Sequence, residues 1–466
     1  MLMGIKMRAY PTSKQRQKLS QWMGAARVIW NAKCEEWQYE TTYARKYMPI
    51  DTYAAINQAY SQYKSNDLTP YLSLVPSQVL RNSATCWYDT MKQWQKGICK
   101  PAKRKKKSTS GSVHLTKELF QFKKDLQGIV RLFIGNKKFS IGELTFKAHK
   151  KFEEPKSIRI RKKAGIWWVS FCYDDSLDEA DLLPAKDQLK TFSKMSEDEL
   201  AQRVIGVDRG VKVAAQTQDK SYDLGERCKR KQHQRECYIS RLQKRLSRQK
   251  KGSKRCYKTK LKISRLHEKS THVRENFCHQ TSHDLTKEPG KVIVMEDLKI
   301  SKMTKKAKPK QEANGKWMKN QAAQKSGLNR SILRVGWHKL ETLTRYKAYR
   351  RGSLLVKISP QFSSQECADC SHIHPANRKN QAEFVCLSCG HRDNADRNAA
   401  LVLKKRAIKL LKHSGTELSD RGVLHLADIG RGVHRKTSKQ TARKQGLRSV
   451  KKDGEGRELN PEATPL

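Results

Sequence analysis

The segment CADCSHIHPANRKNQAEFVCLSCGHRDNADRNAA, residues 367–400, contains two Cys-x-x-Cys pairs that 15 residues separate. Each pair can present two thiolates from one turn, and the loop between them can bring the pairs together around a tetrahedral ion. This spacing predicts a structural Zn²⁺ site and favours it over an iron centre. Because four thiolates complete the coordination shell, the ion has no open position for catalysis. The predicted ligands are Cys367, Cys370, Cys386 and Cys389.

The charge of the chain points to a polyanionic partner. Its 466 residues include 98 Lys plus Arg against 45 Asp plus Glu, which gives a net charge of +53. Since this charge runs through nearly every segment, an extended nucleic-acid channel explains it better than a single basic arm does, and binding should weaken steeply with salt. A ribosomal-type protein and a membrane-surface binder are the alternatives.

Three features bear on cellular location. No apolar run reaches the ~18 residues that span a bilayer, and the start MLMGIKMRAYP lacks the apolar region of a signal peptide. Of the 12 Cys, those outside the two pairs are scattered without mutual spacing, as is usual in a reducing compartment. We therefore expect a cytoplasmic protein.

Apolar residues recur with helical spacing in several stretches. The predicted helices cover 13–40, two stretches of 227–287 broken at Gly252-Ser253, and 331–351. Thr12 or Ser13 can cap the first helix. The stretches within 227–287 carry cations on nearly all of their remaining surface, so packing against nucleic acid suits them better than a solvated face does. Beyond residue 411 the chain is polar and basic, and we expect disorder there.

Between residues 129 and 173 the apolar period changes to two, which predicts a β region that a small barrel would suit. Further strands are predicted at 204–207, 211–215, 292–298 and 354–359. The basic run at 99–112 is either a solvated linker or a phosphate contact. A domain boundary is expected near residue 195, after an acidic linker.

Three carboxylates stand at the ends of predicted elements. Asp208 follows a strand, Glu296 ends another, and Asp396 precedes an apolar helical run. Each alone has an ordinary explanation, as a turn residue, a solvated strand end or a helix cap. Together they are the set that metal-dependent phosphodiester hydrolysis requires, because two Mg²⁺ ions need carboxylates from rigid elements. Asp393 competes with Asp396 for the third position.

Several motifs together resemble the TnpB proteins of bacterial insertion sequences, which are RNA-guided DNA nucleases related to type V CRISPR effectors. These motifs are KMRAYPTSKQRQKL, GVDRGVKVAA, VIVMEDL, VKISPQFSSQECADC and CLSCGHRDNADRNAA. The resemblance covers most of residues 1–411 and assigns Asp208, Glu296 and Asp396 to catalysis and to Mg²⁺ binding. Ser371 departs from the family, which usually has Gly after the second Cys.

The resemblance implies an α/β RNase H-like (RuvC) nuclease domain with an inserted zinc ribbon, and an N-terminal small β-barrel with an inserted helical recognition domain. In this fold the ribbon is inserted just before the last RuvC helix, so zinc would shape nucleic-acid access beside the acids. The implied ranges are 1–10 and 111–195 for the wedge-like β-barrel domain, 11–110 for the helical recognition domain, 196–360 and 393–411 for the RuvC-like domain, 361–392 for the zinc ribbon, and 412–466 for a basic, disordered tail.

The function that the resemblance implies is RNA-guided cleavage of double-stranded DNA next to a short flanking motif. The guide RNA would come from the transposon end, the protein would act as a monomer with its RNA, and its place in the bacterial cytoplasm would be near the nucleoid. A transposon-encoded DNA-binding accessory protein and a transposase that joins strands are the alternatives. The predicted nucleic-acid contacts are Lys103, Arg104, Lys105, Lys106, Arg241, Arg245 and Arg248.

Overall fold

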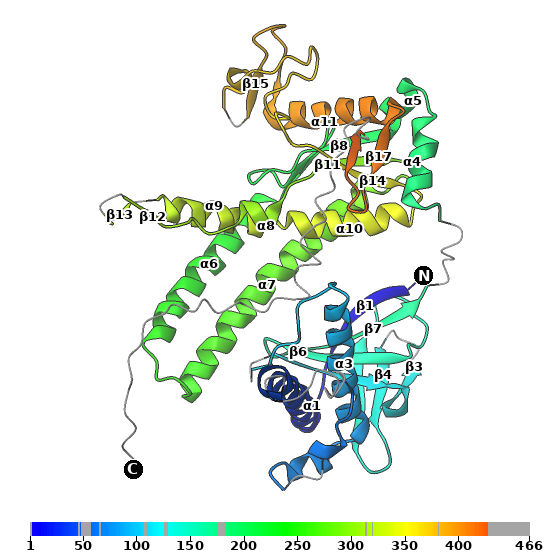
Figure 1. Cartoon of the computed structure of the whole chain (residues 1–466), viewed down its shortest axis with the longest axis vertical. Coiled ribbons are helices and arrows are strands. Elements are labelled where there is room, and N and C mark those ends of the chain that lie inside the picture. The colour runs from blue at the N-terminus through cyan, green and yellow to red at the C-terminus, as the bar shows by residue number, and fades with distance from the viewer. Residues whose placement is uncertain are drawn as a thin grey trace.

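An antiparallel sheet of seven strands joins the start of the chain to residues 111–174 (Figure 1). The structure, a computed structural model, describes residues 2–44, 47, 57–64, 67–106, 110–124, 129–175, 182–312, 315–318, 320–380 and 382–426. The first strand pairs over its whole length with the last strand of this region. In spatial order the strands are β2 (Gly111–Thr116), β6 (Ser157–Lys163), β7 (Ile166–Asp174), β1 (Leu2–Ala9), β5 (Ser140–Lys147), β4 (Ile129–Gly135) and β3 (Phe120–Lys124).

Two helices, α1 (Ser13–Tyr39) and α3 (Ser77–Gln95), pack on this sheet. The predicted first helix is confirmed, and of its two candidate caps Thr12 is the one used, since the Thr12 hydroxyl accepts from the backbone of Gln15 and the Gln15 side chain accepts from the backbone of Thr12. Leu19 and Leu80, one from each helix, are fully buried in a core that includes Phe146 of β5. Shorter helical turns lie at Glu40–Ala44, Ser61–Tyr63, Pro70–Leu74 and Lys117–Leu119.

A second, parallel sheet carries the acids. Its strands lie in the order β14 (Leu354–Ile358), β11 (Val292–Glu296) and β8 (Val204–Val207). Every residue of β11 and β14 is buried, because helices cover both faces of the sheet. One face packs against α11 (Ala395–Lys412), and the other packs against α7 (Lys254–Leu285) and α10 (Trp337–Tyr349).

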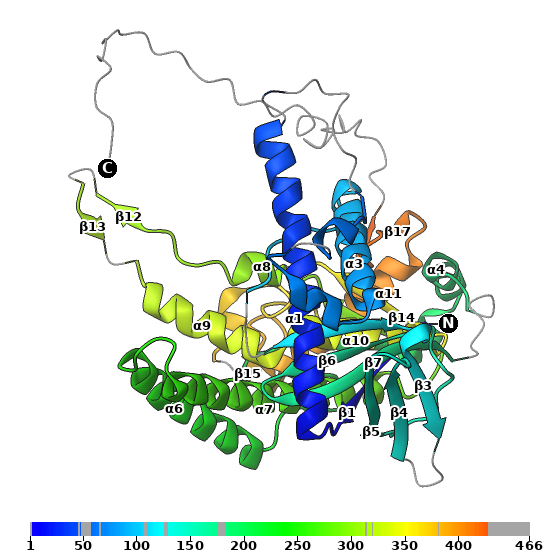
Figure 2. The same cartoon turned by 90° about the horizontal axis from the view of Figure 1, so that it is seen from below.

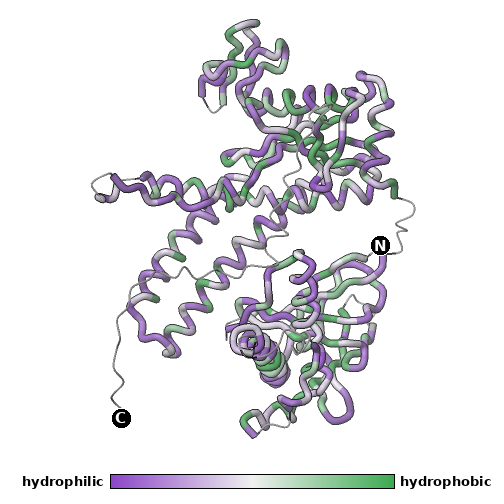
Figure 3. The backbone as a smooth tube through the Cα atoms, in the orientation of Figure 1, coloured by the Kyte–Doolittle hydropathy of each residue, from purple (hydrophilic) through white to green (hydrophobic). Residues whose placement is uncertain are grey.

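A long helical hairpin projects from this layered unit. It consists of α6 (Glu226–Ser247) and α7, with the predicted break at residues 252–253. The two helices lie side by side in both views (Figures 1 and 2). The hairpin is hydrophilic over much of its length, in contrast to the parallel sheet (Figure 3). Ser253 caps α7 through a 3.1 Å bond from the backbone of Cys256.

The structure differs from the predicted elements at three places. The strand expected at 211–215 is shortened to β9 (Ala215–Gln216), which pairs with β10 (Ser221–Tyr222). The helix expected at 331–351 is two helices, α9 (Ala322–Val335) and α10, because Gly336 between them has a left-handed φ of +84°. Part of the tail expected to be disordered forms a hairpin of β17 (Thr416–Leu418) and β18 (Leu424–Leu426).

The remaining described elements connect these units. They are α4 (Ala185–Ser193), α5 (Glu197–Arg203), α8 (Ile300–Met303), β12 (Lys310–Gln311), β13 (Trp317–Met318), a short turn at Pro375–Asn377, β15 (Glu383–Val385) and β16 (Arg392–Asn394). The tail beyond residue 426 lies outside the described residues. Among the helices that the structure describes, none has the length and apolar character needed to span a bilayer.

Candidate active site and metal cluster

Two of the three predicted acids lie at the same edge of the parallel sheet. Asp208 directly follows β8, and Glu296 is the last residue of β11. The two strands pair in register with Val207 beside Met295, so the next residue of each strand stands at the same level. The carboxylates of Asp208 and Glu296 therefore leave adjacent strands at their carboxyl ends.

Asp396 reaches this edge because α11 packs very closely on β8. A Cβ built on Gly206 would lie 2.0 Å from the carbonyl oxygen of Ala400, so only glycine permits the approach. Asp396 stands four residues before Ala400 on the helix, and Asp208 stands two residues after Gly206 on the strand. Each step covers about 6 Å, which accounts for the electrostatic interaction between Asp396 and Asp208.

The charges of Glu296 and Asp396 act on Asp208. Burial, followed by the charges of Glu296 and Asp396, raises the pKa of Asp208 from 3.8 to about 7. Burial also raises the pKa of Glu296, which is 7% exposed. Carboxylates that repel one another in partly desolvated surroundings form a site that a cation stabilises.

Arg378, which the sequence analysis did not select, lies within this acidic cluster. Its Nη2 atom is 3.1 Å from Oδ1 of Asp396, and its charge opposes the rise in the pKa of Asp208. Among the residues that the structure describes, the four Cys are the only group of three or more His, Cys, Asp or Glu whose donor atoms all lie within 4.8 Å of one another, so the three carboxylates are more widely spaced than a closed metal shell. The guanidinium supplies countercharge in this arrangement. Its only sequence signal is its position between the two Cys pairs.

The two candidates for the third acid have different surroundings in the structure. Asp393 pairs with Arg397 at 3.1 Å, whereas Asp396 is the residue whose charge acts on Asp208. Asn394 is the cap of α11, because its side chain accepts from the backbone of Asp396 at 3.0 Å. Asp396 therefore does not serve as the helix cap, which removes its ordinary explanation.

Glu296 is held by a hydroxyl that the sequence analysis also missed. Oγ of Ser363 donates to Oε1 of Glu296 at 2.8 Å, and Ser363 is buried. This bond lowers the pKa of Glu296 against the larger effect of burial. Phe362, which precedes the serine, has a φ of +59°, a conformation that is uncommon for a residue with a side chain. The turn that presents Ser363 is therefore strained.

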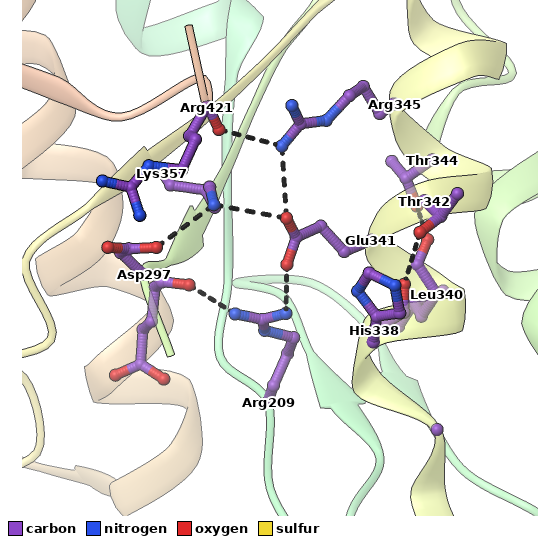
Figure 4. A network of polar contacts seen from close by, with 12 residues as sticks. Arg209, Asp297, His338, Leu340, Glu341, Thr342, Thr344, Arg345, Lys357 and Arg421 are labelled. Carbon is purple, nitrogen blue, oxygen red and sulfur yellow. Dashed lines mark hydrogen bonds and ion pairs between the residues drawn. The ribbon is translucent and has the colours of Figure 1, made fainter. Parts of the chain in front are cut away.

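A network of ion pairs around the buried Arg209 lies next to the two strand ends (Figure 4). Arg209 is fully buried and donates both to the backbone carbonyl of Glu296 and, at 3.2 Å, to Glu341 of α10. Glu341 also pairs with Arg345 at 3.2 Å and with Lys357 of β14 at 3.4 Å. Arg209 directly follows Asp208 in the chain, so its bond to the backbone of Glu296 links the ends of the two strands. The ion pair with Glu341 holds the Arg209 side chain in place.

The four predicted zinc ligands converge as expected. Their sulfur atoms all lie within 4.8 Å of one another, with Cys367 and Cys389 3.6 Å apart and Cys370 and Cys386 3.5 Å apart. Zn–S bonds of ~2.3 Å in a tetrahedron place sulfurs about 3.8 Å apart, so the donor set fits a zinc ion. The two knuckles are alike, since Ser371 and Gly390 each donate a backbone hydrogen bond to the first Cys of their pair.

One asparagine joins the Cys cluster to the acidic helix. Asn398 of α11 is fully buried; its side chain accepts from the backbone of Ala368 at 2.9 Å and donates to the carbonyl of Glu366 at 2.7 Å. Asn398 stands two residues after Asp396. The Cys cluster and Asp396 are therefore fixed to each other.

The predicted nucleic-acid contacts fall into two groups. The segment that holds Lys103 to Lys106 is pinned along α1, because Asn31 exchanges hydrogen bonds with the backbone of Lys105 and Arg104 pairs with Glu35 at 2.7 Å. It is therefore not a loose linker over these residues. The other three cations, Arg241, Arg245 and Arg248, line one hollow of about 430 Å³ together with Lys244, Gln249 and Arg255. No carboxylate lines this hollow among the described residues.

Comparison with protein families identifies the class of protein. Residues 337–403 match the Cas12f1-like TNB domain, residues 185–307 match the OrfB IS605 family described as a probable transposase, and residues 1–42 match the OrfB IS605 helix-turn-helix domain. These matches and the relatives below confirm the resemblance to TnpB-like OrfB proteins that the motifs predicted. Within residues 1–42 the structure shows one strand and one long helix.

Two relatives are similar in sequence to this chain over most of its length. A putative RNA-guided DNA endonuclease InsQ of Escherichia coli (strain K12) is 26% identical over 86% of this chain and 90% of its own length. A putative RNA-guided DNA endonuclease of Streptomyces pristinaespiralis is 25% identical over 85% of this chain and 87% of its own length. A solved Cas12f1–sgRNA–target DNA complex is 16% identical over 87% of this chain and all of that chain, with a TM-score of 0.30.

Proposed function

We propose that the protein is an RNA-guided DNA endonuclease of a transposon that cleaves double-stranded DNA next to a short flanking motif. The observation that carries this proposal is the meeting of three acids from β8, β11 and α11, where the charges of Glu296 and Asp396 act on Asp208. The relatives whose names describe RNA-guided DNA endonucleases extend over more than four-fifths of the chain, which supports the guided form of the activity.

We assign the parallel sheet and its covering helices to an RNase H-like, RuvC-type domain at 196–360 and 393–411, with 361–392 as the inserted zinc ribbon. The seven-stranded sheet is the proposed β-barrel at 1–10 and 111–195, and α1 and α3 belong to the helical recognition domain at 11–110. The pairing of β1 with β7 supports the division of the barrel into two chain segments.

Asp208, Glu296 and Asp396 are proposed to hold two Mg²⁺ ions. Bound magnesium would make a hydrolytic nucleophile available and would neutralise charge that develops on the phosphodiester and on its leaving oxygen. The chain itself supplies the orientation, since Ser363 and Arg209 fix Glu296 and Gly206 admits the helix that bears Asp396. Arg378 lies where its guanidinium can donate to a phosphate oxygen when the strand enters.

The Cys cluster is proposed to bind Zn²⁺ and to have a structural role. Asn398 transmits its position to α11, so a folded ribbon holds the segment that carries Arg378 beside the acids. Zinc would therefore shape access of the strand to the site without taking part in the chemistry.

A guide RNA from the transposon end and a target DNA duplex are the proposed partners. In this scheme base pairing reads the target sequence and the protein reads only the flanking motif. The cationic hollow around Arg245 and the strip at Lys103 to Lys106 are proposed contacts to the nucleic-acid backbone. The working unit is proposed to be a monomer with its RNA in the bacterial cytoplasm.

The deciding experiment purifies the full chain without nuclease treatment and sequences the RNA that remains bound. One discrete RNA with a variable end, together with Mg²⁺-dependent cutting of a matching duplex, is the expected result. Asp208→Ala and Asp396→Ala should each lower the cleavage rate by at least about 10³-fold, because each removes a metal ligand, while RNA binding should persist.

The rival functions give different results. An accessory DNA-binding protein predicts heterogeneous RNA and no effect of Asp208→Ala on any cleavage that is seen. A transposase predicts joined products when a transposon end is supplied, which simple hydrolysis does not give. Either outcome would remove the proposed endonuclease.

A further inference from the structure

A hollow of about 610 Å³ lies between the loop after Asp208, the start of α6, the middle of α7 and the end of α9. Its size falls within the range of sites that take small organic ligands. Its wall begins at Val211, only three residues beyond Asp208. Three residues of extended chain reach at most about 11 Å, so the hollow opens within a short distance of the acidic cluster.

The wall of this hollow is largely apolar. Val211, Leu224, Val335 and Phe277 line it, and Val211 is 38% exposed. Phe277 supplies an aromatic side chain that is only partly covered by the neighbouring core. A flat, apolar group would remove this surface from water on entering.

The side chain of Gln232 also lines the hollow. Gln232 of α6 is 7% exposed, and its side chain makes no hydrogen bond to any residue that the structure describes. This amide can therefore bond to a group that enters the hollow, and a ligand with both a donor and an acceptor on one edge would pair with it. The edges of nucleobases have this property.

Cations border the same hollow. Five Lys and Arg side chains line it against one carboxylate, Asp223, which pairs with Lys229. Lys212 and Arg230 are exposed and have no ion pair within the described part of the chain. The rim therefore attracts an anion, while the interior suits an uncharged ring.

We infer that this hollow binds one unpaired nucleotide of the DNA strand that is to be cut, with its base against Phe277 and Gln232 and its phosphate at Lys212 and Arg230. The choice of DNA rests on the proposed function, because the strand at the acids is then DNA. Because the hollow lies a short, fixed distance from the acidic cluster, a base held in it determines which phosphodiester of the strand reaches the carboxylates. The hollow is therefore a determinant of the cut position.

The test uses the full chain with its co-purified RNA and with Asp208→Asn, so that strands are bound without being cut. Fluorescein-labelled oligodeoxythymidine is bound with one nucleotide at a time made abasic. Removal of the base at one position should weaken binding about tenfold, which is within the range for loss of one stacked base, and other positions should have little effect.

Phe277→Leu in the same background keeps an apolar side chain and removes the ring. It should weaken binding of the intact strand by a similar factor and abolish the effect of the abasic position, because the two changes remove the same contact. Tyr257→Leu is the matched control, since Tyr257 is an exposed aromatic of the same helix outside the hollow. Arg230→Gln should reduce the slope of log affinity against log salt by about 1, the value for one lost phosphate contact. Lys231→Gln changes a neighbouring cation outside the hollow and should leave this slope unchanged.

Three outcomes would overturn the inference. One is an abasic scan with no preferred position, and another is a preferred position that survives in Phe277→Leu. A positional effect seen with oligouridine RNA and absent with DNA would overturn the choice of strand. The binding scan does not depend on cleavage, so a positive scan in a protein that never cuts would leave the nucleotide site intact and remove only the endonuclease.

Discussion

Gly206 and Ala400 are in backbone contact: an added Cβ at Gly206 would lie 2.0 Å from the carbonyl oxygen of Ala400 and 3.0 Å from the backbone nitrogen of Lys404. Both neighbours are helix backbone, so neither can rotate away as a side chain can. This contact sets the separation of α11 from β8, and with it the distance between Asp396 and Asp208.

Gly206→Ala should move α11 outward and lower the free energy of unfolding by about 3 kcal/mol, at the upper end of overpacking effects. The cleavage rate should fall further than stability alone explains, because Asp396 moves with the helix. Melting temperature and single-turnover cleavage measure the two effects. Gly24→Ala, at a helical position with nothing within 4 Å, is the control and should be neutral or slightly stabilising. Equal behaviour of the two variants would contradict the contact.

Asp208→Asn should stabilise the metal-free protein in a pH-dependent way. The pKa of Asp208 is raised to about 7 in the folded state from 3.8, so the folded chain holds this proton more tightly than the unfolded chain does. The free energy of unfolding of the wild type therefore falls as pH rises between about 4 and 7. The introduced amide does not titrate, so above pH 7 the Asp208→Asn variant should be more stable than the wild type by on the order of 2 kcal/mol. Melting curves from pH 4 to about 8 test this.

Mg²⁺ provides the internal control for this series. It should raise the melting temperature of the wild type above pH 7, where the carboxylate form is available, and have much less effect on Asp208→Asn. A variant that responds to Mg²⁺ as the wild type does would show that Asp208 is not a ligand.

Glu341→Gln should destabilise the protein by about 3 kcal/mol, because it leaves the buried guanidinium of Arg209 without its carboxylate. Since Arg209 holds the backbone of Glu296, the variant should also need more Mg²⁺ for half-maximal cleavage. Denaturant midpoints and Mg²⁺ titrations measure both changes. The control is Glu118→Gln, which breaks an exposed pair with Arg81 and should cost less than about 1 kcal/mol. Similar losses in both variants would refute a supporting role for the network.

Ser371→Gly should stabilise the zinc ribbon. Ser371 has a φ of +63°, and Gly390 occupies the same place in the other knuckle with a φ of +72°. Glycine adopts this conformation without the penalty of a side chain, so the gain should be about 0.5–1 kcal/mol and zinc release to a chelator should slow. Gly390→Ser is the matched reverse change and should speed release. The two variants should change the rate of zinc release in opposite directions, and a change in the same direction in both would disprove the explanation.

Arg245→Gln should reduce the slope of log affinity for duplex DNA against log salt by about 0.9, the value for one phosphate contact. Arg245 lines a hollow that has no carboxylate among the described residues. Lys137→Gln, at an exposed turn of the antiparallel sheet, is the control with the same change of charge. If both slopes change equally, binding follows net charge and the hollow has no special role.

Local patterns were sufficient for the features that depend on neighbours in the chain. The spacing of the Cys pairs predicted a cluster whose sulfurs do converge, and the cap at Thr12 was visible as well. The break at Gly336 was missed because the apolar period continues across it, and only its left-handed φ separates α9 from α10.

Contacts between distant residues were beyond such patterns. Arg209 and Glu341 are 132 positions apart, and nothing in the helix that bears Glu341 marks it as different from a surface acid. The strand predicted at 211–215 failed for a related reason. Val211 lines the hollow and is 38% exposed, and pairing with β10 begins only at Ala215. The roles of Asp208, Glu296 and Asp396 came from the family resemblance and remain predictions.

The β17–β18 hairpin sets a limit on how far the chain can be shortened. Lys357 of β14 donates its backbone N–H to Gly422 at 2.7 Å, and Leu424 is buried against the same sheet. The hairpin thus covers the outer edge of β14, which would otherwise offer open hydrogen-bonding groups to another molecule. A truncated variant that ends at residue 426 keeps this edge covered. A variant that ends at residue 411 exposes the edge and should self-associate.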